Sequence, residues 1–163
     1  INSIKRAIMI IGRKQLQRWI QILLYAAKQR DGGASDALMQ TATVRGRLLE
    51  SIAIADRPHD KNHQDRAFMV GVLSLLDTLL GMEMSELVST LSIQKDMGEA
   101  LLTRRGHLGH QLELIEAHEK GEYETVSCML SEMGFINMDE FIKMELEATV
   151  WANRIKDAVN QSA

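Results

Sequence analysis

Hydrophobic residues recur every three to four positions along most of the chain. The clearest case is segment 16–27, where apolar residues follow the i, i+3, i+4, i+7, i+8 spacing and polar residues lie mostly between them. This spacing places the apolar side chains on one face and predicts an amphipathic helix. Segment 64–80 is apolar on most sides and is followed by Gly81. We expect it to form the central, most buried helix and to end at that glycine.

Further helices are predicted from the same periodicity over residues 3–11, 35–55, 85–91, 94–104, 108–119, 123–132 and 138–159. Their ends carry recognisable signals, since Arg104 and Arg105 precede a glycine and Asn137 with Glu140 resembles a capping box. The loop at 57–63 is polar and holds the only proline. No segment alternates with the period of a strand. We therefore expect an all-α fold, a compact multi-helix domain of about eight or nine helices.

Composition narrows the class of protein. Hydrophobic residues make up 45% and charged residues 25% of the 163 positions, as in an ordinary globular domain. The net charge of −3 disfavours nucleic acid as the main partner, because phosphate binding requires a positive surface. A single cysteine fits a cytoplasmic protein, and the absence of a run of about 18 apolar residues predicts no membrane span. The chain opens at Ile1 inside an apolar pattern, so we expect it to be a piece of a longer protein.

Several histidines are candidates for a metal or catalytic site. His59 and Asp60 form the doublet used by metal-dependent HD phosphohydrolases, but that chemistry requires the doublet on a helix that faces further ligands. Because the doublet follows the proline in a polar loop, we expect it to be solvated. His107 and His110 could share a helix face near Glu113. A weak zinc site stays open there, although histidines without a metal are strongly favoured.

Other features favour ordinary structural roles. Cys128 is expected to be a small buried residue on its helix. Residues 99–101 spell the Glu-Ala-Leu motif of the EAL cyclic-dinucleotide phosphodiesterases, but those enzymes are (β/α)₈ barrels of about 250 residues. In a helical stretch of this shorter chain, the triplet is interpreted as a coincidence of good helix formers. Most of the methionines lie at helical apolar spacings, which favours core filling.

Candidate partner contacts lie in two places. Arg13, Lys14 and Arg18 surround a segment with a tryptophan and could contact nucleic acid or an acidic partner. A solvated helix face is the favoured interpretation, since the net charge is negative. Met82 and Met84 are expected to be exposed and could form an adaptable partner surface.

Five segments carry a family resemblance through their order and spacing. They read SIKRAI before Gly12, RKQLQRWIQILLYA at 13–26, FMVGVLSLLD at 68–77, RGHLG at 105–109, and EATVWAN at 147–153. Together they resemble the HDOD domains, the HD-related output domains of bacterial signalling proteins, and in particular the subfamily that follows an EAL domain. The resemblance covers nearly the whole chain. It implies an HD-domain-like helical fold that docks to neighbouring protein surfaces and does not catalyse a reaction.

The resemblance also identifies the positions at which the metal site of HD relatives would lie. Metal-dependent HD relatives carry their His-Asp doublet on the helix that corresponds to 71–77, and the matching positions here are Ser74 and Leu75. Leucine has no donor atom for a metal, and serine is a poor ligand for a catalytic dication. The resemblance therefore implies a degenerate site, and we expect no catalytic residue, no metal ligand and no cofactor.

The resulting hypothesis is a single HDOD domain that lacks its N-terminal helices, with an HD-like core at 1–91 and a helical extension at 92–163. It would be a non-catalytic regulatory module of a bacterial cyclic-di-GMP signalling protein, docking to a protein partner or an adjacent EAL domain. Self-association is also expected where an apolar face stays uncovered. Two alternatives remain: a nucleic-acid-binding module, and a divergent metal-dependent phosphohydrolase that uses His59, Asp60, His63, His107 or His110.

Overall fold

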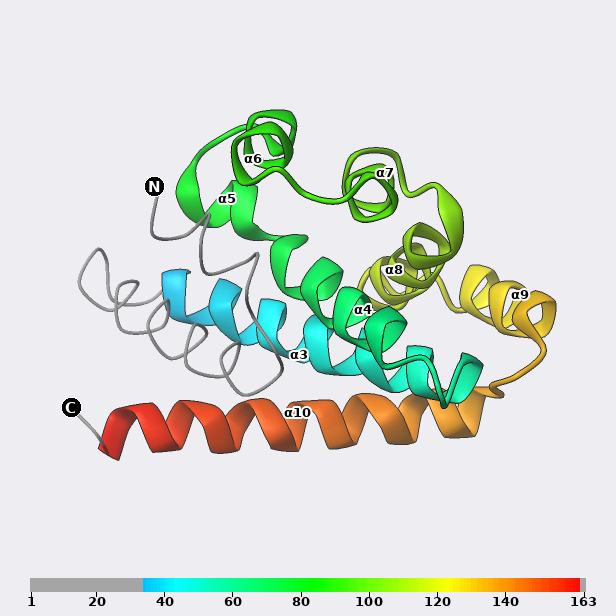
Figure 1. The fold of residues 1–163 in the computed structure, drawn as a ribbon. Coiled ribbons are helices and arrows are strands. Elements are labelled where there is room, and N and C mark those ends of the chain that lie inside the picture. Colours follow the sequence, from blue (N-terminus) through cyan, green and yellow to red (C-terminus); the bar gives the residue numbers. More distant parts are fainter. Residues whose placement is uncertain (1–33, 162–163) are drawn as a thin grey trace.

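The computed structural model describes residues 34–161. Its elements are α3 (Ala34–Asp56), α4 (Lys61–Leu73), α5 (Leu76–Leu80), α6 (Met84–Leu91), α7 (Lys95–Thr103), α8 (Gly106–Glu119), α9 (Tyr123–Met133) and α10 (Met138–Gln161). The described residues form helices and no strand, which confirms the predicted all-α fold. Figure 1 shows α3 and α4 side by side, with α6 and α7 on one side of this pair and α10 on the other.

The pairing of α3 with α4 depends on small residues at the crossing. An added Cβ at Gly71 of α4 would lie 2.6 Å from the carbonyl carbon and oxygen of Arg45 and from Cα of Gly46, both on α3. Contacts this short leave room for hydrogen but not for a methyl group. The glycine in the middle of a helix therefore serves a close approach of two backbones, which offsets its poor helix propensity.

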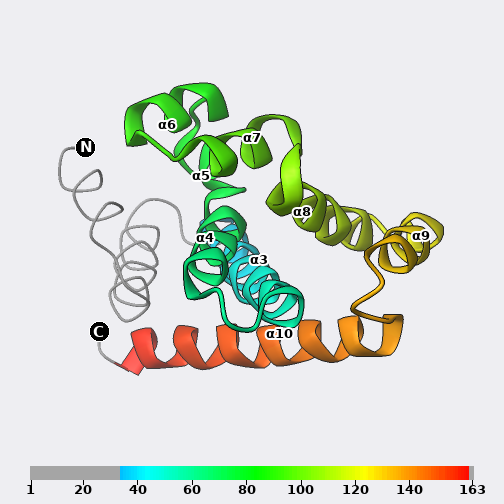
Figure 2. The same ribbon diagram turned by 45° about the vertical axis from the view of Figure 1, so that its right-hand side comes forward.

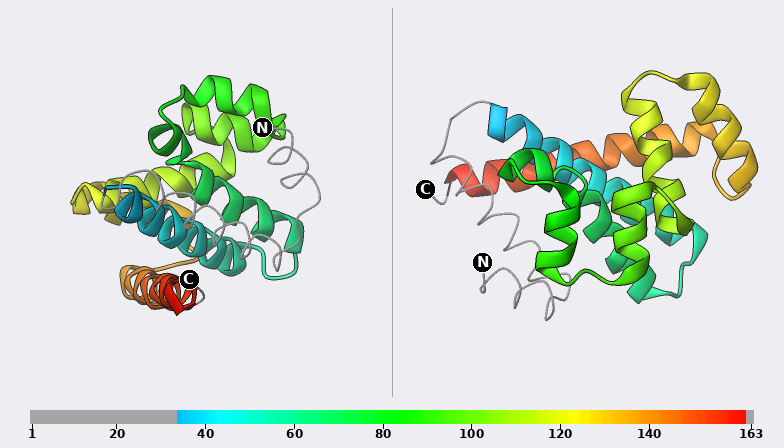
Figure 3. Two further views of the ribbon diagram at one scale, coloured as in Figure 1. Left: turned by 90° about the vertical axis from the view of Figure 1, so that its left-hand side faces the viewer. Right: turned by 90° about the horizontal axis from the view of Figure 1, so that it is seen from above.

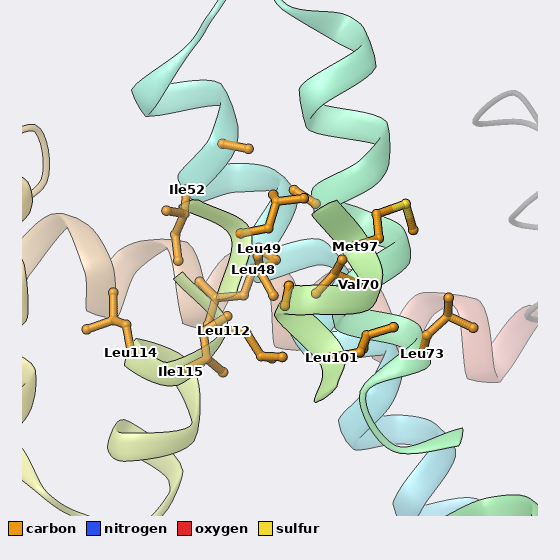
Figure 4. Close-up of a cluster of buried hydrophobic side chains, with 14 of the residues drawn as sticks. Leu48, Leu49, Ile52, Val70, Leu73, Met97, Leu101, Leu112, Leu114 and Ile115 are labelled. Carbon is orange, nitrogen blue, oxygen red and sulfur yellow. The ribbon is translucent and has the colours of Figure 1, made fainter. Parts of the chain in front are cut away.

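The main hydrophobic core lies between α3, α4, α7 and α8, and it extends to α9 and α10. Figure 4 shows its centre, where Leu49 of α3, Val70 of α4, Leu101 of α7 and Leu112 of α8 gather. All four are at most 2% exposed. Burying an aliphatic side chain of this size contributes about 1.5–3 kcal/mol. Residues on both sides of position 91 enter this one cluster, so the described part of the chain shares a common core.

The long helix α10 packs against α3 and crosses it obliquely, as Figures 2 and 3 show from other directions. A second, smaller core cluster holds it there, in which Trp151 packs edge-on against Phe68 with ring centroids 6.0 Å apart. The guanidinium of Arg47 lies 5.9 Å from the centre of the Trp151 ring. This contact adds a cation–π attraction on top of apolar burial.

The predicted helix over 64–80 is wrong in one respect, because it is two helices. The chain turns at Ser74 and Leu75, between α4 and α5. The Ser74 hydroxyl donates a hydrogen bond to the carbonyl oxygen of Gly71 at 2.7 Å, and Leu75 leaves the helical conformation with φ −118° and ψ 6°. Serine side chains compete for backbone groups in this way. The interpretation of α4 as a strongly buried helix is confirmed.

Two local predictions have opposite outcomes. The capping box is confirmed, since the Glu140 amide donates to Oδ1 of Asn137 at 3.0 Å and the Asn137 amide donates to Oε2 of Glu140 at 2.9 Å. The prediction that Cys128 is buried is wrong, because its side chain is exposed. Helix α9 buries Val126, Met129 and Leu130, and the cysteine lies away from that face. None of the helices in the described residues combines the length and apolar composition needed to cross a membrane.

Candidate functional site

Ser74 lies in a buried hydrogen-bond network centred on Arg45. The guanidinium of Arg45, from the middle of α3, donates through Nη1 to the Ser74 hydroxyl at 3.0 Å. Its Nε and Nη2 donate to the two carboxylate oxygens of Glu119 on α8, at 2.8 Å and 2.5 Å. Arg45 is 8% exposed and Ser74 is 5% exposed. A two-pronged contact of this kind holds the arginine in one orientation.

Glu116 extends the network to the loop before α8. One carboxylate oxygen lies 3.5 Å from Nη1 of Arg45, and both oxygens accept hydrogen bonds from Arg104 at 2.7 Å. Burial alone raises the pKa of Glu116, but the hydrogen bonds and charge of Arg104, together with the charge of Arg45, outweigh burial. The pKa of Glu116 is therefore lowered, and the carboxylate is charged at neutral pH.

The network determines what the Ser74 position can bind. A dication held by the Ser74 hydroxyl would lie beside the Arg45 guanidinium and would be repelled by it. Leu75, the next position, offers no donor atom, and its side chain is half-buried. The charges that surround this position are thus already paired with one another. In the described part of the protein, the arrangement joins α3, α4 and α8.

A different group of potential ligands lies at the other end of α4. Asp56 ends α3, His63 lies in the first turn of α4, and His107 lies in the first turn of α8. One ligand atom from each lies within 4.8 Å of the other two. Nε2 of His107 is 2.5 Å from Oδ2 of Asp56, and Nε2 of His63 is 3.7 Å from the same oxygen. Two imidazoles and a carboxylate form a ligand set that suits zinc.

His63 is the unusual member of this group. Its side chain is only 3% exposed, and its Nε2 has no hydrogen-bond partner in the described part of the protein. Burial, followed by the charges of Arg57 and His107, lowers the pKa of His63, and Asp56 and Asp60 offset this only in part. The ring is therefore neutral at neutral pH. An unpaired buried nitrogen is costly, and such groups frequently mark a function.

The other histidines have separate environments. His59 is exposed, and Asp60 caps α4 by accepting a hydrogen bond from the His63 amide at 2.9 Å. His110 lies 3.8 Å from Glu113 on the surface of α8. His118 lies 2.9 Å from Glu145, far along α8 from the group above. The structure thus brings His63 and His107 together and leaves His59 and His110 outside.

Only two of the five predicted partner-contact residues lie in the described part of the structure. Arg13, Lys14 and Arg18 lie outside the described residues. Met82 and Met84 are half-buried and pack against the main core at α5 and α6. They are therefore less exposed than predicted, and their role as partner contacts stays a prediction.

An apolar surface that the sequence analysis did not single out lies on α10. Ile142, Leu146 and Val150 follow one another at intervals of four residues and are 41%, 62% and 50% exposed. This spacing places them on one face of the helix. We call these three residues the α10 stripe. The opposite face of α10 contains Phe141, Ala148 and Ala152, which are at most 3% exposed.

Comparisons with known proteins give two relatives and no family or structural match. The chain is 31% identical over 160 residues to the uncharacterized protein YuxH of Bacillus subtilis, covering 97% of this chain and 37% of that protein. It is 29% identical over 155 residues to the cyclic di-GMP phosphodiesterase CdgJ of Vibrio cholerae, covering 95% of this chain and 35% of that protein. No family model and no solved structure matches. The chain therefore spans little more than a third of the length of these relatives.

Proposed function

We propose that this chain is a non-catalytic HDOD-type regulatory module of a bacterial cyclic-di-GMP signalling protein. Similarity along 95% of the chain to a protein named as a cyclic di-GMP phosphodiesterase supports the pathway. The Ser74 network supports the non-catalytic role and carries the proposal. The resemblance places a metal-binding doublet at two positions that are Ser74 and Leu75 in this protein. Ser74 accepts a hydrogen bond from the buried Arg45.

A phosphodiesterase assay tests the non-catalytic role. We expect the purified 163-residue chain to hydrolyse neither cyclic di-GMP nor bis(p-nitrophenyl) phosphate in the presence of Mn²⁺, measured over hours by chromatography and absorbance. The physical reason is that the Ser74 position offers a guanidinium where an HD enzyme needs a dication. Ser74→Ala is the matched check, because it should leave the absence of turnover unchanged.

The divergent phosphohydrolase is the second candidate, and the group of Asp56, His63 and His107 favours it. Three protein ligands with a position open to solvent are the arrangement of many catalytic zinc sites. Turnover by the wild-type chain that disappears in His107→Gln would establish that function and end the non-catalytic proposal. Turnover that survives His107→Gln would indicate a contaminating enzyme.

Regulation by docking requires a surface, and the α10 stripe is the one we propose. Monomeric proteins rarely leave adjacent large aliphatic side chains this exposed without a use. The proposed occupant is an adjacent domain of the same protein, because both relatives are almost three times as long as the segment they share with this chain. An EAL phosphodiesterase domain is the occupant that the resemblance implies. Docking that differs between two states of that domain would shift its activity.

A charge placed in the stripe tests this docking. In the longer protein that carries the chain, we expect Leu146→Glu to change the rate of cyclic-di-GMP hydrolysis by about fivefold or more, since coupling between domains typically amounts to about 1–3 kcal/mol. Leu146 is 62% exposed, so the isolated chain should keep its thermal midpoint. The measurement is the hydrolysis rate of the intact protein at saturating substrate.

Leu102→Glu is the matched control for that experiment. Leu102 is 47% exposed on α7, so the chemical change is the same at a site outside the α10 stripe. Equal rates for Leu102→Glu and the wild type, with an altered rate for Leu146→Glu, would support docking through α10. Equal rates for all three proteins would refute it.

A further inference from the structure

We propose that Asp56, His63 and His107 form a binding site for a first-row transition-metal ion, with Zn²⁺ as the representative ion. This site goes beyond the proposed function and does not depend on it. Ser74 and His63 are separated by eleven positions along α4 and its cap, about 16 Å at the helical rise of 1.5 Å per residue. The Ser74 network and the metal site are therefore different places.

The distances suit zinc after a small rearrangement. Zinc bonds of about 2.0–2.1 Å in a tetrahedron place two ligand atoms about 3.4 Å apart. Oδ2 of Asp56 and Nε2 of His63 are already 3.7 Å apart. Nε2 of His107 is 2.5 Å from the same oxygen and has to withdraw by about 1 Å to admit the ion. The His107 side chain is 46% exposed, so it has room to move.

The buried His63 nitrogen is the independent sign of a ligand. Nε2 of His63 has no hydrogen-bond partner among the described residues, and it lies within 4.8 Å of the other two candidate donor atoms. A metal ion in this place would accept its lone pair and remove the cost of burying it unpaired. The Asp56 carboxylate would balance part of the ion's charge. The half-exposed side of His107 leaves a fourth position for water, as three-ligand zinc sites have.

Arg57 competes with the ion for the Asp56 carboxylate. Nε of Arg57 lies 3.4 Å from Oδ2 of Asp56, but the Arg57 side chain is 48% exposed and can turn into solvent. The ligand set also separates metals by class. Two imidazoles favour Zn²⁺, Ni²⁺ or Cu²⁺ over Mg²⁺ and Ca²⁺, which prefer oxygen ligands. A bound ion would fasten the start of α8 to the junction of α3 and α4, three elements that approach one another at this point.

Metal titration of the purified chain tests the site. We expect isothermal titration calorimetry to show one Zn²⁺ per chain in the presence of excess Mg²⁺, and Co²⁺ to give the visible absorption of a low-coordinate nitrogen and oxygen site. His107→Gln should weaken Zn²⁺ binding by more than about tenfold, because even indirect ligand contacts carry that much affinity. Arg57→Gln should tighten binding, since it removes the competing cation.

His110→Gln is the matched control, three residues along the same helix and also exposed. Binding kept in His110→Gln and lost in His107→Gln supports the site. If the wild-type chain binds no Zn²⁺ at about 100 micromolar, a typical assay limit, the proposal is overturned. An equal loss of Zn²⁺ binding in His107→Gln and His110→Gln also overturns it. Should His107→Gln fail to fold, NMR of the wild-type imidazoles decides: Zn²⁺ must shift the resonances of His63 and His107 and leave those of His110.

Discussion

Gly71→Ala is expected to destabilise the protein by at least about 3 kcal/mol, at the upper end of overpacking effects. The new methyl group would lie 2.6 Å from backbone atoms of Arg45 and Gly46. No side-chain rotation can relieve a contact with backbone, so α3 and α4 have to separate. That separation loosens the core on both sides of the crossing. Urea denaturation followed by circular dichroism measures the change, as a lower midpoint with an unchanged slope.

Gly98→Ala is the matched control for this substitution. Gly98 also lies inside a helix, α7, and among the described residues its added Cβ would meet only Cγ1 of Val88, at 3.2 Å. A side-chain methyl can shift by a few tenths of an ångström, and alanine gains about 1 kcal/mol of helix propensity over glycine. We expect Gly98→Ala to stay within about 1 kcal/mol of the wild type. Similar stabilities for the two variants would contradict the close crossing of α3 and α4.

Local periodicity explains how much of the fold could be predicted from the sequence. The helices follow from apolar spacing, which is a property of neighbouring residues. The turn at Ser74 and Leu75 could not be predicted in this way, because both lie inside an apolar run with helical spacing. The prediction that Cys128 is buried is wrong for a related reason. A small residue fits either face of α9, and Val126 and Met129 determine which face is buried.

The candidate sites depend on distant residues and were harder to predict. Asp56 and His107 are 51 positions apart, and Asp56 has no sequence feature that distinguishes it from an ordinary acidic helix end. Arg45 did carry a signal. It lies three residues after Ala42 and four before Leu49, in phase with the apolar stripe of its helix. A charged residue on a buried face requires a partner, so this position indicates a buried ion pair without identifying it.

Arg45→Met is expected to destabilise the protein by about 3 kcal/mol at pH 7, the lower end of the range for a broken buried ion pair. Methionine keeps much of the volume but leaves Glu119 without its two hydrogen bonds and Ser74 without its donor. Glu119 is 32% exposed, so water partly replaces the arginine and limits the loss. Thermal and urea unfolding measure the change in the free energy of unfolding.

The same chemical change at a more exposed ion pair is the control. Arg66 lies 2.9 Å from Asp96, with side chains that are 27% and 47% exposed, and Arg66→Met should cost less than about 1 kcal/mol. Equal losses at the two sites would contradict the special role of the Arg45 network. A smaller loss for the double variant Arg45→Met with Glu119→Leu than for the sum of the single variants would show that the two side chains stabilise each other directly.

The pH dependence of the Arg45→Met effect follows from the same network. The pKa of Glu116 is lowered in the folded protein, so its pairing with Arg104 and Arg45 stabilises the native state above the usual pKa of a glutamate. That stability is lost as the pH falls through the folded-state pKa, because a protonated carboxyl no longer attracts the guanidinium. The difference between wild type and Arg45→Met should therefore narrow below about pH 4. A difference that stays constant as the pH falls through the folded-state pKa of Glu116 would mean that the charge of Glu116 does not contribute to the stabilisation by Arg45.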